Sequence, residues 1–333
     1  LEWRRLAACL LAPFAPQITH RPGQFAGQQR RRPSGAGAAL LVSLTLLGCQ
    51  PAKPPDQLVV ASRGSVESVD PVDVTTIAGQ QLLSALGDPL YSSDAEGRIT
   101  PRLATALPQF SADGRIARIP LRRGVRFHDG TAFDAAAMVF SLERFRALGK
   151  LSYLLDERIR AVRARGPHEL ELELKRPYGA LAALLSSSNL TPLSPAAYRQ
   201  HRNRSLNDRF IGTGPYRLVR FTPQQQSLRP FAGYWGPQPR NRGLQLVSLS
   251  NSTALYGALI SAEVDLLLSQ GLESDQQRDL ARRSGSGQLV QAVGPALEIG
   301  YLTLLSDRPP LDQPVLRQAV ALSLDRQLIS ERV

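Results

Sequence analysis

Alternation of apolar and polar residues is most regular over residues 168–175, whose sequence is HELELELK. Three leucines occupy one face and three glutamates the other, so this period of two predicts a half-buried strand, which Pro177 would end. Residues 116–121 alternate in the same way, and residues 58–62 (LVVAS) form a short apolar run of strand type. We therefore expect strands in three widely separated parts of the chain.

Helical spacing of apolar residues occurs in three other segments. Residues 76–86 follow a turn at Asp70 and Pro71, and their apolar side consists of Ile77, Leu82, Leu83 and Leu86. A second helix is predicted from an N-cap at Asp134 through Leu148, with an apolar stripe at Met138, Leu142 and Phe145. A third begins at Asp312 and Pro314 and runs through Leu316, Ala319, Val320 and Leu324. Strands and helices mix without an internal repeat, which predicts an α/β or α+β fold.

Several conspicuous residues are better explained by folding than by chemistry. Residues 124–130 (GVRFHDG) suit a turn before the Asp134 helix, and we assign His128 to that turn. Residues 212–216 (GTGPY) suit the start of a strand where the backbone passes close to a neighbour. Tyr234 and Trp235 are interpreted as core anchors, with ligand stacking as the alternative.

The N-terminal region has the pattern of a secretory signal. Arg30, Arg31 and Arg32 precede an apolar run over 36–47 that is too short to span a bilayer. The run ends in LLGC, which resembles the lipobox of bacterial lipoproteins. That resemblance implies cleavage between Gly48 and Cys49 and a diacylglycerol on Cys49; the alternative is that Cys49 is a core cysteine of a short helix.

The leader predicted in this way covers residues 1–48, which is longer than the usual length of about 15 to 30 residues. The chain also opens on Leu1. We interpret residues 1–29 as an open reading frame extended too far upstream, although a second apolar stretch at 6–15 leaves open that they belong to the leader. Residues 49–56 (CQPAKPPD) then read as a lipidated, proline-rich tether.

Charge and cysteine content exclude several kinds of protein. The formal net charge is +12, of which residues 1–48 contribute +5, and arginines are scattered over the whole chain without interleaved aromatic residues. We therefore expect no nucleic-acid partner. The two cysteines, Cys9 and Cys49, precede the globular part, so no disulfide framework, metal cluster or thiol nucleophile is expected there. No segment after the tether is long and apolar enough for a transmembrane helix.

Four segments, taken together, resemble the family 5 extracellular solute-binding proteins. They lie in family order between residues 57 and 329: residues 98–145, residues 211–223 with 233–239, residues 262–267 (AEVDLL), and residues 301–329. The resemblance implies an α/β fold of the two-lobed, type II periplasmic-binding-protein kind. Lobe one would comprise 57–95 and 186–290, with a subdomain inserted at 96–185. Lobe two would start at 291 and be mostly missing, so that the chain as given is expected to bind weakly.

The resemblance also implies a function, that of the substrate-binding component of an ABC-type importer. Such a protein captures a peptide or similar small solute outside the cytoplasmic membrane and delivers it to permease and ATPase subunits. We expect a lipid-anchored monomer in the periplasm or on the outer face of that membrane, without a cofactor or a metal. The expected ligand contacts are Thr75, Thr76 and Ile77, with Tyr153 from the insert; the alternative for the threonines is a helix N-cap.

Two other functions remain open from the residues alone. An enzyme is not expected, because His128, His168 and His201 lie far apart and the chain has no H-E-x-x-H, G-x-S-x-G, P-loop or G-x-G-x-x-G motif. An extracytoplasmic hydrolase is the enzymatic alternative, since serines and carboxylates can converge in space. The other alternative is a lipoprotein remnant or gene fragment that no longer binds a solute.

Overall fold

The computed structural model describes residues 56–332, with gaps at 95, 202, 268–270 and 293–300. Its contacts divide the chain into residues 1–51 and 52–333, and all the described residues belong to the second unit. The leader, Cys49 and most of the tether therefore lie outside the described residues. None of the described helices is both long enough and apolar enough to cross a membrane.

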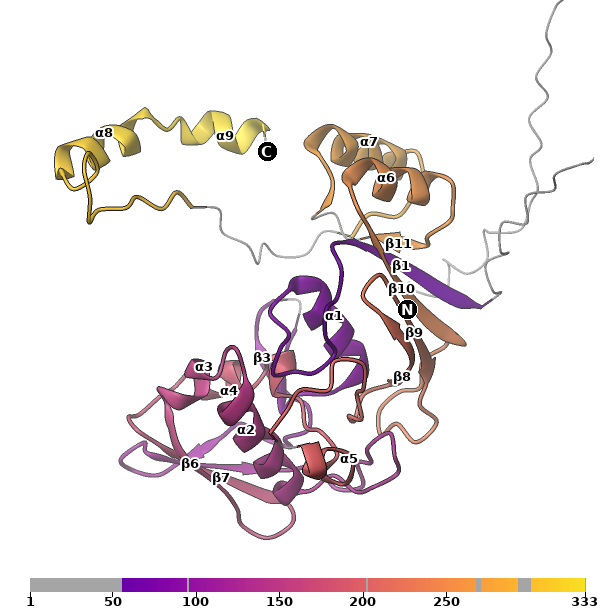
Figure 1. Ribbon diagram of the computed structural model, residues 1–333, viewed down its shortest axis with the longest axis vertical. Coiled ribbons are helices and arrows are strands. Elements are labelled where there is room, and N and C mark those ends of the chain that lie inside the picture. Colours follow the sequence, from indigo (N-terminus) through magenta and orange to yellow (C-terminus); the bar gives the residue numbers. More distant parts are fainter. Residues whose placement is uncertain (1–55, 95, 202, 268–270, 293–300, 333) are drawn as a thin grey trace, which may run out of the picture. The chain divides into compact units, whose positions relative to one another are not determined.

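One sheet of five strands combines the first strand of the described chain with four strands from residues 216–267 (Figure 1). Its order is β11 (Leu266–Leu267), β1 (Gln57–Arg63), β10 (Gly243–Leu249), β9 (Gln225–Pro230) and β8 (Tyr216–Thr222). Strand β1 runs parallel to both of its neighbours, whereas β10, β9 and β8 form antiparallel pairs. The strand predicted over 58–62 is thereby confirmed as a central strand, which fits its continuous apolar sequence.

A second sheet is wholly antiparallel and lies within residues 109–174. Its order is β4 (Gln109–Phe110), β5 (Ile116–Pro120), β7 (Glu169–Leu174) and β6 (Ile159–Ala164). The leucines of β7 are buried, and its Glu171 pairs with Arg118 of β5 at 3.2 Å on the solvent side. The alternation read from HELELELK is therefore confirmed, as is the buried face of 116–121.

Helix α2 (Ala135–Leu148) covers the buried face of this second sheet through contacts with β6 and β7. Asp134 caps it as predicted, with its carboxylate accepting from the backbone N–H of Ala137 at 2.8 Å. Met138, Leu142 and Phe145 are all buried in the same cluster as the β7 leucines. This cluster is the largest apolar core of the described residues.

Helix α1 (Ile77–Leu86) belongs to a second core, beneath the five-stranded sheet. Leu82, Leu83 and Leu86 are fully buried as predicted, but Ile77 is 47% exposed. Ile77 begins the helix at the edge of this core and borders a cavity described below, so it lies on the apolar side of the helix without being buried.

The backbone at Gly214 passes directly against the end of α1. A Cβ on Gly214 would lie 2.4 Å from the carbonyl carbon of Leu86, and the N–H of Gly214 donates to that carbonyl oxygen at 3.0 Å. Buried His128 contacts the Gly214 carbonyl oxygen through Nε2 at 3.1 Å. The predicted close approach of the backbone at residues 212–216 is confirmed, and so is the prediction that His128 has a structural role.

The other described elements lie outside these two sheets and helices. They are β2 (Tyr91–Ser93), β3 (Ile99–Pro101), α3 (Tyr153–Asp156), α4 (Leu181–Leu184), η2 (Ser188–Leu190), α5 (Pro195–Tyr198), η3 (Arg199–His201), α6 (Ser252–Ile260), α7 (Ser274–Gly285), α8 (Pro314–Ser323) and α9 (Arg326–Arg332). Helix α6 covers β1 and β10 and forms a third apolar cluster around Leu255. Helix α8 begins at Pro314 as predicted but ends at Ser323, one residue before Leu324.

The five-stranded and four-stranded sheets draw on different parts of the chain. The antiparallel sheet draws only on residues within 96–185, and the five-stranded sheet draws on 57–63 and 216–267. The boundaries of the lobes themselves stay a prediction.

Candidate functional site

One cavity lies at the start of helix α1, and a second lies along that helix and the residues after its end. The first, which we call the threonine cavity, measures about 250 Å³ and is lined by Glu67, Ser68, Asp73, Val74, Thr75, Thr76, Lys150 and Asn207. The second, the serine cavity, measures about 540 Å³ and is lined by Ile77, Gln80, Gln81, Ser84, Gly87, Asp88, Pro89, Ser92, Ser93, Arg102, Ser186, Ser187 and Ser188. The second volume falls within the range of about 300 to 1,000 Å³ that is usual for small-molecule sites.

The threonine cavity contains two of the residues predicted from the sequence. Thr76 is the N-cap of α1, and its hydroxyl accepts from the N–H of Gly79 at 3.2 Å. Thr75 is exposed at the wall of the cavity, next to Lys150, whose ammonium lies 3.5 Å from Asp73. The N-cap alternative therefore holds for Thr76, while Thr75 has its side chain available to a ligand.

A buried ion pair fixes the loop that carries these threonines. Both terminal nitrogens of Arg144 donate to the carboxylate of Asp70, at 2.7 and 2.6 Å, and both side chains are almost fully buried. The same carboxylate accepts from the N–H of Leu206 at 2.9 Å. Removing either partner of such a pair strongly destabilises the fold, because the remaining charge would be buried without a counter-ion.

Two further contacts hold the same loop from its other side. The side-chain amide of Asn189 donates to the carbonyl oxygens of Pro71 and Val74, at 2.9 and 2.7 Å. The backbone N–H of Lys150 donates to the carbonyl oxygen of Val72 at 2.8 Å. The loop before α1 is thus fastened by α2, η2 and the segment after α2, which gives its exposed threonines a defined position.

Most of the residues that line the serine cavity carry a polar side chain. Only Ile77, Gly87 and Pro89 among its lining residues lack a polar side chain. Its hydroxyl and amide groups come from α1 and β2 and from residues 186–188, which lie far from those two elements in the sequence. A site of this composition suits a ligand that itself carries many hydrogen-bonding groups.

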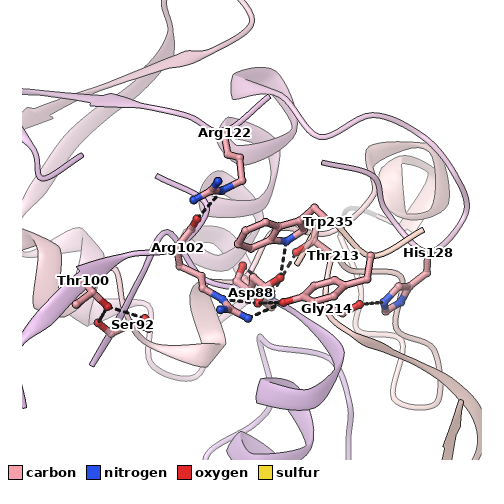
Figure 2. A network of polar contacts seen from close by, with 11 residues as sticks. Asp88, Ser92, Thr100, Arg102, Arg122, His128, Thr213, Gly214 and Trp235 are labelled. Carbon is pink, nitrogen blue, oxygen red and sulfur yellow. Dashed lines mark hydrogen bonds and ion pairs between the residues drawn. The ribbon is translucent and has the colours of Figure 1, made fainter. Parts of the chain in front are cut away.

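One wall of the serine cavity rests on a network around buried Asp88, shown in Figure 2. Arg102 donates from Nε to Asp88 at 2.8 Å and from Nη2 to the Tyr234 hydroxyl at 2.5 Å. The indole N–H of Trp235 donates to the other carboxylate oxygen of Asp88 at 2.9 Å. The guanidinium of Arg122 stacks on the Trp235 ring, with its carbon 4.4 Å from the centroid.

Burial sets the protonation of this network. Desolvation raises the pKa of Asp88 above its ordinary value, against the opposing effects of Arg102, Trp235 and Tyr234. Burial also raises the pKa of Tyr234 to about 12, so its phenol keeps its proton at neutral pH. The interpretation of Tyr234 as a core residue is confirmed by its burial. Trp235 is partly buried and packs against the apolar cluster that contains the β7 leucines.

The sequence predictions recover only part of this region. Thr75, Thr76 and Ile77 do line the two cavities, whereas Tyr153 heads α3 with 52% exposure and lines neither of them. Sequence reasoning missed the other polar lining groups, among them Lys150, Asn207, Arg102 and the serines of 186–188. The serine run 186–188 was a detectable signal, but a run of serines is equally typical of an ordinary loop.

Within the described part of the chain, no group of three or more His, Cys, Asp or Glu residues is placed to hold a metal ion. The two cavities therefore offer hydroxyl, amide, carboxylate and guanidinium groups for direct contact with a solute.

The class of protein follows from the fold. Solved structures that match it are periplasmic binding proteins of type II. NikZ from Campylobacter jejuni, in complex with Ni(L-His), gives a TM-score of 0.68 at 19% identity, covering 83% of this chain and 55% of NikZ. MoaA of A. tumefaciens R10, in complex with mannopinic acid, gives 0.71 at 25% identity, covering 83% of this chain and 57% of MoaA. The predicted α/β fold class is confirmed.

The chain belongs to the bacterial extracellular solute-binding proteins of family 5, because the model for the middle region of that family matches residues 98–333. The glutathione-binding protein GsiB of Escherichia coli strain K12 is 26% identical over 273 residues, which make up 81% of this chain and 52% of GsiB. The chain thus spans about half the length of the curated relatives it matches. The resemblance drawn from the four segments is confirmed.

Proposed function

We propose that this protein is the substrate-binding component of an ABC-type importer, and that it captures a peptide or another small polar solute outside the cytoplasmic membrane. The observation that carries the proposal is the pair of cavities, one at the start of α1 and one along it, both lined by polar side chains, in a chain that belongs to family 5. Similar proteins support the proposal, because GsiB is named as a glutathione-binding protein and the structures of NikZ and MoaA are complexes with Ni(L-His) and mannopinic acid. The captured solute would be handed to permease and ATPase subunits.

The geometry suggests how a solute is held. The loop before α1 is fixed by Asp70, Arg144 and Asn189, so a ligand meets Thr75 and the start of α1 in a prepared position. A prepared wall lowers the ordering cost of binding. Tyr153 is proposed to reach the ligand from the rim of the insert. In a two-lobed protein the ligand gains its remaining contacts when the second lobe closes over the first, and those contacts drive closure.

Attachment to the membrane is the second part of the proposal. The order of arginines, apolar run, Gly48 and Cys49 supports a lipid anchor on Cys49, which would keep the protein in the periplasm or at the outer face of the cytoplasmic membrane. We further propose a monomer that acts without a cofactor and without catalysis. The family binds solutes, and this supports the non-enzymatic reading over the hydrolase alternative.

Binding is tested with a bulky substitution at Thr75, which is exposed and has no role in capping α1. Isothermal titration of the full-length gene product against glutathione and a pool of short peptides should give saturable binding. Thr75→Trp should weaken it about tenfold or more by filling the threonine cavity. Thr253→Trp, at an exposed threonine of α6 that lines neither cavity, is the matched control.

The outcomes separate the alternatives. Saturable binding that Thr75→Trp removes and Thr253→Trp leaves intact supports the proposal. No binding of any solute by the wild type would instead support the non-binding remnant. Turnover of a bound solute, detected as a new mass after incubation, would favour the hydrolase.

A further inference from the structure

The serine cavity is lined by many polar side chains beside the apolar parts of its wall. Four of its polar side chains, those of Gln80, Gln81, Ser187 and Ser188, make no hydrogen bond to another described residue. They are all partly exposed on the cavity side of α1 and of residues 186–188. Half-buried hydroxyls and amides without internal partners are ready to bond a ligand or water, and they offer both donors and acceptors.

One positive charge faces this array of hydroxyls. The Arg102 side chain is 36% exposed in the cavity wall, while its counter-ion Asp88 is only 3% exposed behind it. Nε and Nη2 of Arg102 are engaged by Asp88 and Tyr234, which leaves Nη1 without an acceptor among the described residues. Arg122 adds a second guanidinium on the far face of Trp235, so the network holds two cations against one carboxylate.

The position of Arg102 is also fixed. Its guanidinium is held by two hydrogen bonds and lies 5.2 Å from the centroid of the Trp235 ring. A guanidinium held in this way loses little freedom when it binds an anion, and its planar fork matches a carboxylate. A phosphate monoester would bring about two negative charges, more than the single excess positive charge of the network balances.

We propose that the serine cavity binds a polyhydroxylated carboxylate, such as a sugar acid, with its carboxylate on Nη1 of Arg102 and its hydroxyls on the glutamines of α1 and the serines of 186–188. Arg102 then determines specificity for an acid over its neutral counterpart. Asp88, Tyr234 and Trp235 are positioning residues that act through Arg102. This inference rests on the proposed solute-binding function and names a class of solute for it.

The test uses three probes on the full-length gene product. D-gluconate carries the carboxylate and the hydroxyls, gluconamide is its neutral counterpart, and hexanoate has the carboxylate without the hydroxyls. Isothermal titration should show binding of gluconate at least about tenfold tighter than of either other probe, because charge-assisted and neutral hydrogen bonds both contribute. This comparison needs no substitution. Equal affinities for gluconate and gluconamide, or no binding of gluconate, would overturn the proposal.

A matched pair of variants then assigns the effect to Arg102. Arg102→Gln should weaken gluconate binding about tenfold or more and leave gluconamide unchanged, whereas Arg98→Gln, at an exposed arginine outside the cavity, should change neither. If Arg102→Gln lowers the melting temperature, Ser187→Val with Ser188→Val replaces it and should weaken gluconate and gluconamide alike.

Failure of this inference is distinguishable from failure of the proposed function. One result would remove the sugar-acid assignment and leave the solute-binding function intact. In that result, glutathione or a peptide binds in a way that depends on Thr75 but not on Arg102, and gluconate is not preferred over gluconamide.

Discussion

At the scale of single residues, buried charged and polar groups position the exposed ones. Asp70 and Arg144 form a bidentate pair with almost no exposure, and the Arg144 guanidinium also lies 5.2 Å from the Tyr198 ring centroid. The pair ties the loop before α1 to α2, although 74 residues separate the partners. Stability and the geometry of the threonine cavity therefore depend on the same contact.

We expect Arg144→Leu to lower the free energy of unfolding by about 3 to 5 kcal/mol, because it leaves the Asp70 carboxylate buried without a counter-ion. Urea denaturation measures this loss. Arg146→Leu is the control on the same helix, since Arg146 pairs with Asp156 and Glu143 near the surface and should change stability by about 1 kcal/mol or less. Equal effects of the two variants would contradict the prediction.

The buried imidazole of His128 makes stability depend on pH. Burial lowers the pKa of His128 from 6.5 to about 4, against the raising effect of the Gly214 contact. The unfolded chain then binds more protons than the folded one between those values, so stability is full above about pH 6.5 and falls as pH drops toward 4.

His128→Gln should remove this loss. Between pH 7 and pH 5 the wild type should lose about 2 kcal/mol more than the variant, as measured by urea denaturation at both values. The comparison at each pH cancels the contribution of other titrating groups. Parallel pH profiles for the two proteins would show that His128 titrates normally when folded.

At the scale of elements, close backbone contact joins the end of α1 to the start of β8. Gly214 approaches Leu86 and Gly87 without room for a side chain. The same junction carries the hydrogen bond from the N–H of Asp88 to the Thr213 hydroxyl at 3.2 Å. The serine cavity borders Gly87 and Asp88, so its shape depends on this packing contact between the end of a helix and the start of a strand.

Gly214→Ala tests this junction. The added Cβ would lie 2.4 Å from the Leu86 carbonyl carbon. Because the Cβ is bonded directly to the backbone and the carbonyl carbon is itself a backbone atom, neither can turn aside and the two segments must separate. We expect a loss of about 1 to 3 kcal/mol in thermal or chemical unfolding. Gly257→Ala inside α6, where nothing lies within 4 Å of the added carbon, should instead raise stability by up to about 1 kcal/mol. A neutral Gly214→Ala would contradict the close contact.

At the scale of the whole molecule, the described residues include a sheet with parallel strands, an antiparallel sheet inserted in the sequence between its strands, and the two cavities beside α1. The two sheets have separate apolar clusters, and Asp70 with Arg144 bridges the segments that carry them. Attachment to a membrane would set where this unit works, and it depends on Cys49, which lies outside the described residues.

Cys49→Ser should abolish incorporation of labelled palmitate and release the protein from the membrane fraction, because the thioether needs the Cys49 sulfur and stable anchoring needs more than one acyl chain. Cys9→Ser, at the other cysteine of the chain, should change neither measurement. Membrane partition that survives Cys49→Ser would contradict the lipoprotein assignment.

The sequence by itself determined the elements and the family. Strands β1, β5 and β7 and helix α2 could be predicted because their signals are local: a period of two, a period of 3.6, and an N-cap at Asp134. The family was recognisable because four segments keep their order and turn residues along the chain. These features depend on residues close together in sequence, so they could be read without knowing how distant segments meet.

Only the tertiary structure decided where the cavities lie and which residues line them. Arg102 and Tyr234 are 132 residues apart in the sequence, and Asn189 and Pro71 are 118 apart, yet each pair is hydrogen-bonded. No local sequence pattern predicts such contacts. Ile77 has the spacing of a core residue yet lies at a cavity, because exposure at the end of a helix depends on what packs beside it. Periodicity describes one face of one element, whereas a binding site arises from side chains of several elements that only folding brings together.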